Sequence, residues 1–557
     1  MASDFSRRQF LTAGTAFGAT LGLAGLVGCA PKTAPQPQSG QTGTADQGAA
    51  ATSAKAVSTS SRLIDVREQE VVATEECDIV VCGSGTAGTY AAVRAAELGA
   101  RVIWLEKTGM KGGTSTIAEG TLAYNTTELM EAGMVTDLQA EFLGYMQWHN
   151  WGAYGPGIWC YLNNAGPAVD WAKTHGAKMY AGDYGSMYSC FSDEGAWIHN
   201  GEGMLQPLWA YGETLSTLDF RLNTPAVNII TKGDKVVGVY AKDERGIIRI
   251  NAKAVVLATG GFGKNPEMCA ERLRVPAERV TFLGFDGQDG DGINMALAAG
   301  AVSQAPSSVM YGLSKIKDES WSSMLSVFTQ WPPSLRYPLE TGKTLPMVNE
   351  SGCRFYNETL ADDCDTSRLN VALASQAKVF TLFDERHVQT YEGEDKMNEF
   401  VAFMGVGGGE LRASIESNKN VYKADTIEEL ADKIGVDRSA LADTVADYNA
   451  RANGDGTPDP FGADASYMTP LETAPFYAAQ AEACAYATVG GIRGDEDSRA
   501  VGVDGKPVAG LFVCGIDNGS LQYNDYPYGL HGGSGQGSCC ATGFAAANAA
   551  CKDLGLA

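Results

Sequence analysis

Short apolar runs bounded by glycine-rich turns recur along the chain from residue 77 onward. Residues 77–82 (CDIVVC) predict a short buried strand, and the small-residue stretch TYAAVRAAELGA over 89–100 predicts a helix. Residues 101–105 (RVIWL) predict a second strand, which ends at Glu106. A strand, a helix and another strand in this order are the repeating unit of an α/β fold, so the pattern predicts that fold class.

The same pattern returns in later segments. Residues 251–265 (NAKAVVLATGGFGKN) and 510–519 (GLFVCGIDNG) each place an apolar strand before a glycine turn. Residues 228–250 (NIITKGDKVVGVYAKDERGIIRI) have the pattern of a hairpin, and residues 284–301 open a helix after an acidic, glycine-rich turn. These segments extend the predicted α/β fold almost to the C-terminus.

The first residues have the composition of an export signal. SRRQFL, over 6–11, is a twin-arginine pattern, and a stretch rich in Ala, Gly and Leu follows it up to Cys29. We predict a signal peptide over 1–28 rather than a membrane anchor, because glycines break the stretch and it is barely long enough to span. Leu-Val-Gly-Cys resembles a lipobox, which predicts a lipid anchor on Cys29. The polar, proline-rich segment 29–70 predicts a flexible tether that holds the protein at the cell surface or the outer face of the cytoplasmic membrane.

Charge and cysteine usage narrow the function further. The net charge of −24 argues against nucleic acid as a partner, because such binding needs a basic surface. The thirteen cysteines include no C-x-x-C pair, so neither a haem attachment nor a zinc knuckle is indicated. Small buried side chains are the interpretation we favour, with disulfides and an iron–sulfur cluster built from dispersed cysteines as alternatives.

The strand–helix–strand unit contains a dinucleotide-binding fingerprint. Gly83, Gly85 and Gly88 form G-x-G-x-x-G between the predicted strand and helix, with Thr86 and Ala87 inside it, and Glu106 ends the next strand. The first two glycines let the backbone turn and approach a pyrophosphate, the third permits close helix–strand packing, and the acid can bind a ribose diol. In this context the fingerprint predicts a Rossmann-like dinucleotide-binding domain.

Several segments together resemble the FAD-contacting motifs of the fumarate reductase/succinate dehydrogenase flavoprotein superfamily. The resemblance covers most of residues 72–557 and implies FAD, bound without a covalent link. It implies a discontinuous FAD-binding domain, 72–305 and 485–557, with an α+β capping domain inserted over 306–484. Besides the fingerprint and Glu106, it implies cofactor contacts for Lys107, Gly112, Gly113, Thr114, Ser115, Ala226, Val227, Ala258, Thr259, Gly260, Gly261, Gly515, Asp517, Gly535, Gln536, Gly537 and Ser538.

A second dinucleotide fingerprint is not found, because GVGGGE over 405–410 lacks a preceding strand. Without a nicotinamide site, the electrons are expected from a membrane cytochrome or a quinone-linked donor.

The fumarate reductase branch of the superfamily holds its dicarboxylate with cationic side chains that this chain lacks at the matching positions. Those positions carry Asp362, Tyr486 and Gly535. Burying a dianion without cationic partners costs several kcal/mol per charge. Fumarate is therefore disfavoured, although Arg336, Arg368 or Arg493 could substitute.

The stretch YNDYPYGLHGG near the C-terminus resembles the 3-ketosteroid dehydrogenase branch instead. There a tyrosine hydroxyl and a glycine N–H bind a ketone oxygen together, and here Tyr528 and Gly532 have that spacing. Two neutral donors stabilise the enolate that forms when hydride reaches the β-carbon of an enone. Tyr486 and His531 are further candidates for proton transfer.

We therefore predict an exported FAD-dependent reductase of a C=C bond conjugated to a carbonyl, such as a steroid-like enone or an unsaturated lactone. The chain also resembles reductases of gut Actinobacteria of the cardiac glycoside reductase type. The alternatives are a fumarate- or urocanate-type reductase of a small acid, a 3-ketosteroid dehydrogenase working in the oxidative direction, and a non-catalytic flavoprotein.

Overall fold

The computed structural model describes most of the chain after the predicted export segment. Residues 1–62 lie outside the described part, and with them the predicted signal peptide, Cys29 and most of the tether. Tyr528, Arg336 and Asp362 also fall outside it, as does the side chain of Arg368. The described residues are 63–182, 186–195, 197–310, 314–320, 323–330, 345–358, 366–391, 411–523, 525–527 and 531–556.

A parallel sheet forms the centre of the larger lobe. Its middle strand, β12 (Ala254–Leu257), pairs with β2 (Ile79–Cys82) on one side and β22 (Pro507–Val513) on the other. β3 (Val102–Leu105) and β8 (Leu218–Arg221) extend the sheet beyond β2. The carboxyl ends of these strands share one edge, where open α/β sheets bind their ligands. The predicted α/β fold class is confirmed.

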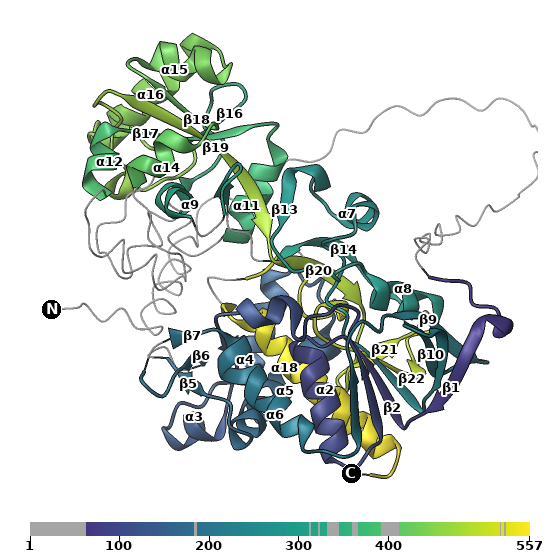
Figure 1. The fold of residues 1–557 in the computed structure, drawn as a ribbon. Helices are drawn as coiled ribbons and strands as arrows, with labels where there is room; N and C mark the ends of the chain where they lie inside the picture. The colour runs from purple at the N-terminus through teal and green to yellow at the C-terminus, as the bar shows by residue number, and fades with distance from the viewer. Residues whose placement is uncertain are drawn as a thin grey trace, which may run out of the picture. The chain divides into compact units, whose positions relative to one another are not determined.

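Side chains of successive residues in β2 enter two different cores. Ile79 and Val81 pack with helices α2 (Thr86–Glu97), α5 (Gly155–Thr174) and α18 (Ser534–Asp553), which cover one face of the sheet. Val80 and Cys82 pack with the opposite layer. That layer is an antiparallel meander of β9 (Ala226–Lys232), β10 (Lys235–Asp243) and β11 (Gly246–Asn251), with β1 (Val71–Glu76) parallel to β11 (Figure 1). Since β2 is buried on both faces, its sequence is uniformly apolar.

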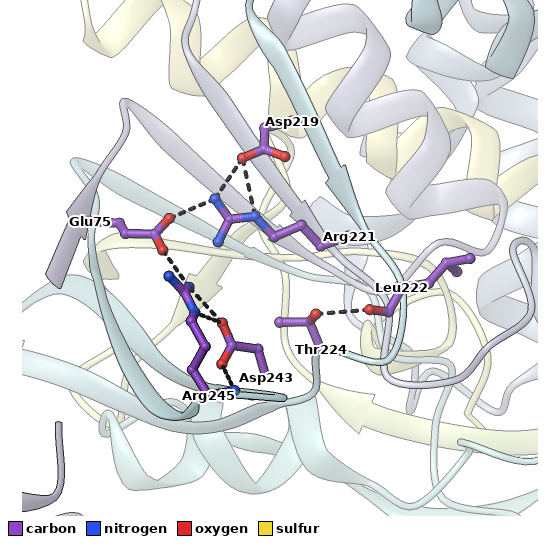
Figure 2. A network of polar contacts seen from close by, with 7 residues as sticks. All are labelled: Glu75, Asp219, Arg221, Leu222, Thr224, Asp243 and Arg245. Atoms are coloured by element: carbon purple, nitrogen blue, oxygen red, sulfur yellow. Dashed lines mark hydrogen bonds and ion pairs between the residues drawn. The ribbon is translucent and has the colours of Figure 1, made fainter. Parts of the chain in front are cut away.

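An ion-pair network connects the meander layer to the edge of the parallel sheet, as Figure 2 shows. Glu75 on β1 accepts hydrogen bonds from Arg221 on β8 at 2.6 Å and from Arg245 at 3.0 Å. Asp219 and Asp243 each bind one of these guanidinium groups in turn. Glu75 therefore bridges two cations from different layers, and the Arg221 hydrogen bond is the main cause that lowers the pKa of Glu75.

Replacing Glu75 with glutamine should lower the free energy of unfolding at pH 7 by about 1 kcal/mol, because a partly buried carboxylate with two cationic partners is lost. A carboxyl group with a lowered folded-state pKa stabilises the fold above its unfolded pKa and loses that effect as the pH falls. Urea unfolding should therefore separate wild type from Glu75→Gln at pH 7, with the two curves converging near pH 3. Glu76→Gln, at the neighbouring exposed position of β1, is the matched control. Equal losses in both variants would contradict the bridging role.

Between β3 and β8 the described residues form a small antiparallel sheet and four helices. Its central strand is β6 (Met187–Phe191), which pairs with β4 (Thr121–Leu122) and with β5 (Met179–Ala181). β7 (Trp197–Ile198) also pairs with β6. The helices of this region besides α5 are α3 (Thr127–Glu131), α4 (Leu138–Trp148) and α6 (Gln206–Glu213), with the short turns η2 (Gly113–Ile117) and η3 (Gly201–Leu205).

The second lobe is built around the long strand β19 (Phe476–Ala485). β19 pairs with β17 (Val379–Asp384), β18 (Val421–Ala424), β15 (Lys315–Ile316) and β13 (Val280–Phe282), and β16 (Met347–Asn349) pairs with β17. Its helices are α9 (Met324–Gln330), α11 (Thr366–Ser375), α12 (Glu385–Tyr391), α14 (Leu411–Ser417), α15 (Ile427–Ile434) and α16 (Arg438–Ala452).

The sheet of the second lobe includes β13, which precedes the predicted start of the capping domain at residue 306. The limits of the domains remain a prediction. After Tyr486 the chain continues as β20 (Ala487–Ile492), which pairs with β14 (Ser303–Met310). The remaining elements are α7 (Pro266–Arg272), α8 (Asp291–Ala298), β21 (Arg499–Val501), η1 (Glu68–Glu70), η4 (Ala277–Arg279), η6 (Ala465–Tyr467) and η7 (Gly515–Asp517). In the described part of the chain, none of the helices has both the length and the apolar character that a membrane span requires.

Candidate cofactor and active site

The fingerprint glycines form a turn that leaves no space for side chains. Gly83 has a φ of +104°, and a Cβ there would lie 2.2 Å from the carbonyl oxygen of Ala258. A Cβ on Gly88 would lie 1.9 Å from the carbonyl oxygen of Gly83. Gly85, the N-cap of α2, has only the Ser115 hydroxyl within 3.3 Å of its Cβ position. Gly83 and Gly88 therefore fix the turn, while Gly85 keeps the N-terminus of α2 accessible.

One cavity lies at the carboxyl edge of the parallel sheet, lined by the turns that follow β2, β3 and β12. The space between its walls is about 1240 Å³, with the open solvent at its mouth included. The predicted contacts that line it are Gly83, Gly85, Glu106, Gly112, Gly113, Thr114, Ser115, Ala258, Thr259, Gly260, Gly535 and Gln536, together with the predicted catalytic residue Tyr486.

Glu106 is held in place by its neighbours on the cavity wall. Its Oε2 accepts hydrogen bonds from the Ser84 N–H at 3.0 Å and the Ser84 hydroxyl at 2.7 Å. Its Oε1 accepts from the Thr108 N–H at 2.8 Å and the Thr108 hydroxyl at 2.9 Å. Four donors thus fix both carboxylate oxygens at the end of β3, the position that the fingerprint assigns to a ribose-binding acid.

Two helix N-termini meet beside this cavity. The side-chain amide of Gln536, in the first turn of α18, donates to the Thr86 hydroxyl in the first turn of α2 at 2.6 Å. The Ser115 hydroxyl accepts from the Thr86 N–H at 3.0 Å. Helix N-termini carry a positive partial charge and unpaired N–H groups, so the pair suits a cofactor with a pyrophosphate and an electron-poor ring.

Asp517 lies behind the cavity and fixes the turn after β12. Its carboxylate accepts from the Thr259 N–H at 2.6 Å, the Thr259 hydroxyl at 2.8 Å and the Gly261 N–H at 3.0 Å. Asp517 is fully buried, and burial raises its pKa to about 6 against the effect of these hydrogen bonds. Instead of lining the cavity, this predicted contact residue shapes the Ala258–Gly260 wall.

Other predicted contacts lie away from the cavity wall and pack the structure. Lys107 pairs with Asp289 and Asp291 at 2.5 and 2.6 Å. Although burial lowers the pKa of Lys107, the two carboxylates raise it overall. Ala226 and Val227 begin β9, where Val227 accepts a hydrogen bond from Ile64. The other residues of this group are Thr86, Ala87, Gly88, Gly261, Gly515, Gly537 and Ser538, which surround the first turns of α2 and α18 or the turns after β12 and β22.

Tyr526 lies on the cavity wall, although the sequence analysis did not select it. The ring is buried, and its hydroxyl accepts from the Gly533 N–H at 2.8 Å and the Gly535 N–H at 3.4 Å. Tyr526 therefore covers the N-terminus of α18 from two residues before Tyr528, which is outside the described residues. The feature of the sequence that could have indicated Tyr526 is its position shortly before the glycine-rich start of α18.

His531 and Gly532 are not among the residues that line the cavity, whereas the next residue, Gly533, is on its wall. The Nδ1 of His531 is 3.2 Å from the Tyr124 hydroxyl and 3.6 Å from Oε2 of Glu141, and its ring stacks on Tyr145 at 4.1 Å. His531 thus belongs to a buried polar cluster, and it can position the turn that leads into α18. Gly532 occupies the turn between His531 and α18.

The side chain of Gln288 indicates which hydrogen-bonding groups a cofactor in the cavity must supply. Its Nε2 donates to the Thr114 hydroxyl at 3.0 Å, whereas its buried Oε1 has no hydrogen-bond partner among the described residues. An unpaired buried acceptor costs about 1–3 kcal/mol. Since the side chain lines the cavity, a hydrogen-bond donor of the bound cofactor would satisfy it, and the lining therefore fits the implied FAD.

Cationic side chains are absent from the described residues that line the cavity. Arg354 is buried in ion pairs with Glu358 at 2.5 Å and Asp459 at 2.6 Å. Arg493, proposed as a substitute carboxylate ligand, donates to Gln304 at 2.7 Å instead. The described lining is thus uncharged except for Glu106, Glu119 and Asp286.

The cysteines give no support to the iron–sulfur alternative. Of the eleven in the described part, ten are buried, and all eleven are free thiols. The described residues also contain no group of three or more metal-binding side chains.

A model of the FAD binding domain family matches residues 78–524. The chain belongs to this family. Vinyl phenol reductase of Lactiplantibacillus plantarum is 29% identical over 478 residues, covering 81% of this chain and 91% of that protein. Digoxin reductase of Eggerthella lenta is 27% identical over 557 residues, covering 91% and 90%. Among solved structures, 3-ketosteroid Δ1-dehydrogenase of Sterolibacterium denitrificans matches with a TM-score of 0.65 at 19% identity, covering 86% of this chain and 100% of that one. The last likeness is one of fold.

These findings confirm three predictions from the sequence. The family is that of the FAD-dependent oxidoreductases, with a gut actinobacterial relative and a fold shared with a 3-ketosteroid dehydrogenase. The cofactor is FAD, and the protein is an FAD-dependent oxidoreductase.

Proposed function

We propose that the protein reduces a C=C bond conjugated to a carbonyl in a neutral, bulky substrate such as a steroid-like enone or an unsaturated lactone. The observation that carries this proposal is the cofactor cavity, whose described lining offers the tyrosines Tyr486 and Tyr526 and no cation. A substrate with carboxylates would find no charge partner there, whereas a carbonyl oxygen needs only neutral donors. The relatives named for vinyl phenol and digoxin support the choice, because neither molecule carries a carboxylate.

FAD, held by the turns that follow β2, β3 and β12, would supply the hydride that adds to the β-carbon. The protein's contribution is to hold the substrate carbonyl and to bring a proton to the α-carbon. Tyr528 and Gly532, which directly precedes the lining residue Gly533, are the proposed donors to the carbonyl oxygen, where negative charge develops. Each such donor contributes about 3 kcal/mol to the transition state. Tyr486 joins the two lobes at the cavity wall and is a further proposed substrate contact.

Export and electron supply complete the proposal. The twin-arginine pattern and the lipobox-like Cys29 support a lipid-anchored protein outside the cytoplasmic membrane. A membrane cytochrome or a quinone-linked enzyme would supply the electrons, as the names of the cytochrome-type fumarate reductases among the relatives suggest.

Two alternatives have support of their own. Fumarate and urocanate reductases also match this chain, which favours a small unsaturated acid if Arg336 or Arg368 enters the site. The match to a 3-ketosteroid dehydrogenase structure concerns the fold only, so the oxidative direction rests on the Tyr528–Gly532 spacing.

Reoxidation of the reduced flavin tests these choices directly. The holoprotein, reduced anaerobically with dithionite, would be mixed with 4-vinylphenol, a cardenolide lactone, a 4-en-3-one steroid, fumarate or urocanate, and flavin absorbance followed. We expect the cardenolide lactone or the 4-en-3-one steroid to reoxidise it rapidly, and Tyr528→Phe to slow this step about 100-fold at unchanged FAD content. Tyr523→Phe, a half-buried tyrosine of the same stretch that packs against Gly152, is the matched control. Reoxidation by the acids alone or by 4-vinylphenol alone, which has no carbonyl, or equal rates in both variants, would overturn the proposal.

A further inference from the structure

Glu119 is a carboxylic acid on the cavity wall that the proposed reaction does not yet use. It follows η2 and precedes β4, and both sides of it are fixed by backbone hydrogen bonds. The carbonyl of Ala118 accepts from the Asn200 N–H at 2.8 Å, and the Leu122 N–H donates to the carbonyl of Gly533 at 3.0 Å. Glu119 is therefore held beside the loop that begins α18, on the same wall as Tyr526 and Gly533.

The carboxylate of Glu119 makes no hydrogen bond or ion pair with the described residues, unlike that of Glu106. Burial alone raises the pKa of Glu119 to about 7. A carboxyl group that faces a cofactor cavity without a protein partner and titrates near neutrality has the properties of a proton-transfer group.

Other titratable groups lie around Glu119, but they do not cause its raised pKa. The elements packed against 118–122 carry Tyr188 on β6, His199 just before η3, Glu202 within η3, and Tyr526 ahead of α18. The further titratable residues on the cavity wall are Glu106, Asp286, Tyr486 and Cys539. None of these contributes to the raised pKa of Glu119. Its protonation is therefore free to follow the charge of whatever occupies the cavity.

We infer that Glu119 takes up a proton when the bound FAD is reduced and gives this proton to the substrate α-carbon. The inference rests on the proposed function, in which FAD occupies this cavity and a C=C bond is reduced. Two electrons from the external donor and one proton make up the hydride that adds to the β-carbon. The proton from Glu119 completes the new C–H bond at the α-carbon, so two electrons and two protons are added in total.

Electrostatics explains why proton uptake at Glu119 accompanies reduction. Reduced flavin that carries one proton is an anion, and a nearby like charge disfavours an ionised carboxylate. The pKa of Glu119 therefore rises further on reduction, and a carboxylate that was ionised before reduction becomes protonated. Glu119 is then protonated at the moment when the hydride becomes available.

The pH dependence of the flavin midpoint potential tests this inference without turnover. In a two-electron couple each accompanying proton contributes about 30 mV per pH unit. Above pH 7 we expect a slope of about 59 mV per pH unit in the FAD-loaded wild type and about 30 mV in Glu119→Gln. Glu119→Asp keeps a titrating group and should retain the steeper slope. Glu131→Gln, an exposed glutamate on α3, is the matched control and should behave as wild type.

Equal slopes in wild type and Glu119→Gln, with normal FAD content, would overturn the role of Glu119 and leave the proposed function intact. A loss of the steep slope in Glu119→Asp would also count against it, because a titrating carboxyl group would still be present. A wild-type holoprotein whose reduced flavin is not reoxidised by any alkene in the panel would instead contradict the proposed function.

Discussion

Gly88→Ala should yield almost no folded, FAD-containing protein. The added methyl carbon would lie 1.9 Å from the carbonyl oxygen of Gly83. The methyl group is attached directly to the backbone and the carbonyl is part of it, so neither can rotate away. Helix α2 would have to move off β2, where it packs Ala87, Ala91 and Ala95 into the main core. We expect a loss of more than about 3 kcal/mol, which is overpacking at the upper end of its usual range. Soluble yield and the ratio of flavin to protein absorbance after gel filtration measure the effect.

Gly85→Ala, three residues earlier, provides the comparison that separates folding from cofactor binding. Its nearest neighbour would be the Ser115 hydroxyl at 3.3 Å, a contact that a small side-chain movement relieves. This variant should fold at nearly normal yield but hold FAD more weakly, because the methyl group intrudes where the backbone approaches the cofactor. Normal FAD content in Gly88→Ala would show that the close approach of α2 to the fingerprint turn is not needed.

Asp517→Ala should remove FAD from the protein and lower its free energy of unfolding by about 3–9 kcal/mol. The substitution leaves two backbone N–H groups and one hydroxyl without their acceptor in the interior, each at about 1–3 kcal/mol. The turn over Ala258–Gly260 would lose the side chain that holds it against the cavity. Flavin content and urea unfolding at pH 7 measure the two consequences.

Asp517→Asn serves as the pH control for this prediction. Because burial raises the pKa of Asp517 to about 6, the folded state binds a proton more tightly than the unfolded chain, whose carboxyl group titrates near 3.8. The stability of the wild type should therefore fall relative to Asp517→Asn as the pH rises from about 4 to 6. A stability difference that is constant over this range would contradict the raised pKa.

The local part of this architecture was predictable from the sequence. The strand expected over 77–82 is β2, the helix expected after it is α2, and RVIWL forms β3. These elements depend on short-range signals, namely apolar runs and glycines whose missing Cβ atoms the turn requires. The hairpin expected over 228–250 is likewise present, as β9–β10–β11 of the meander.

The direction of side chains at the ends of elements could not be predicted in the same way. Asp517 was expected to touch the cofactor but turns toward Thr259 and Gly261, because segments far apart in the sequence come together there. Tyr526 and Glu119 were missed for the same reason. Their burial is created by α18 and the segment before β4, and neither stretch has a periodic pattern that reports it.

The contact between Thr86 and Gln536 also determines when this protein becomes a flavoprotein. The two residues are 450 positions apart, which the ribosome needs roughly 20–90 s to translate at about 5–20 residues per second. The fingerprint turn therefore leaves the ribosome long before helix α18, which completes the cavity. Until α18 has been synthesised, the nascent chain has no complete binding site for FAD. Cofactor capture is consequently a late event in the biosynthesis of this protein, and a premature stop codon that removes only α18 would leave a nearly full-length chain without its flavin.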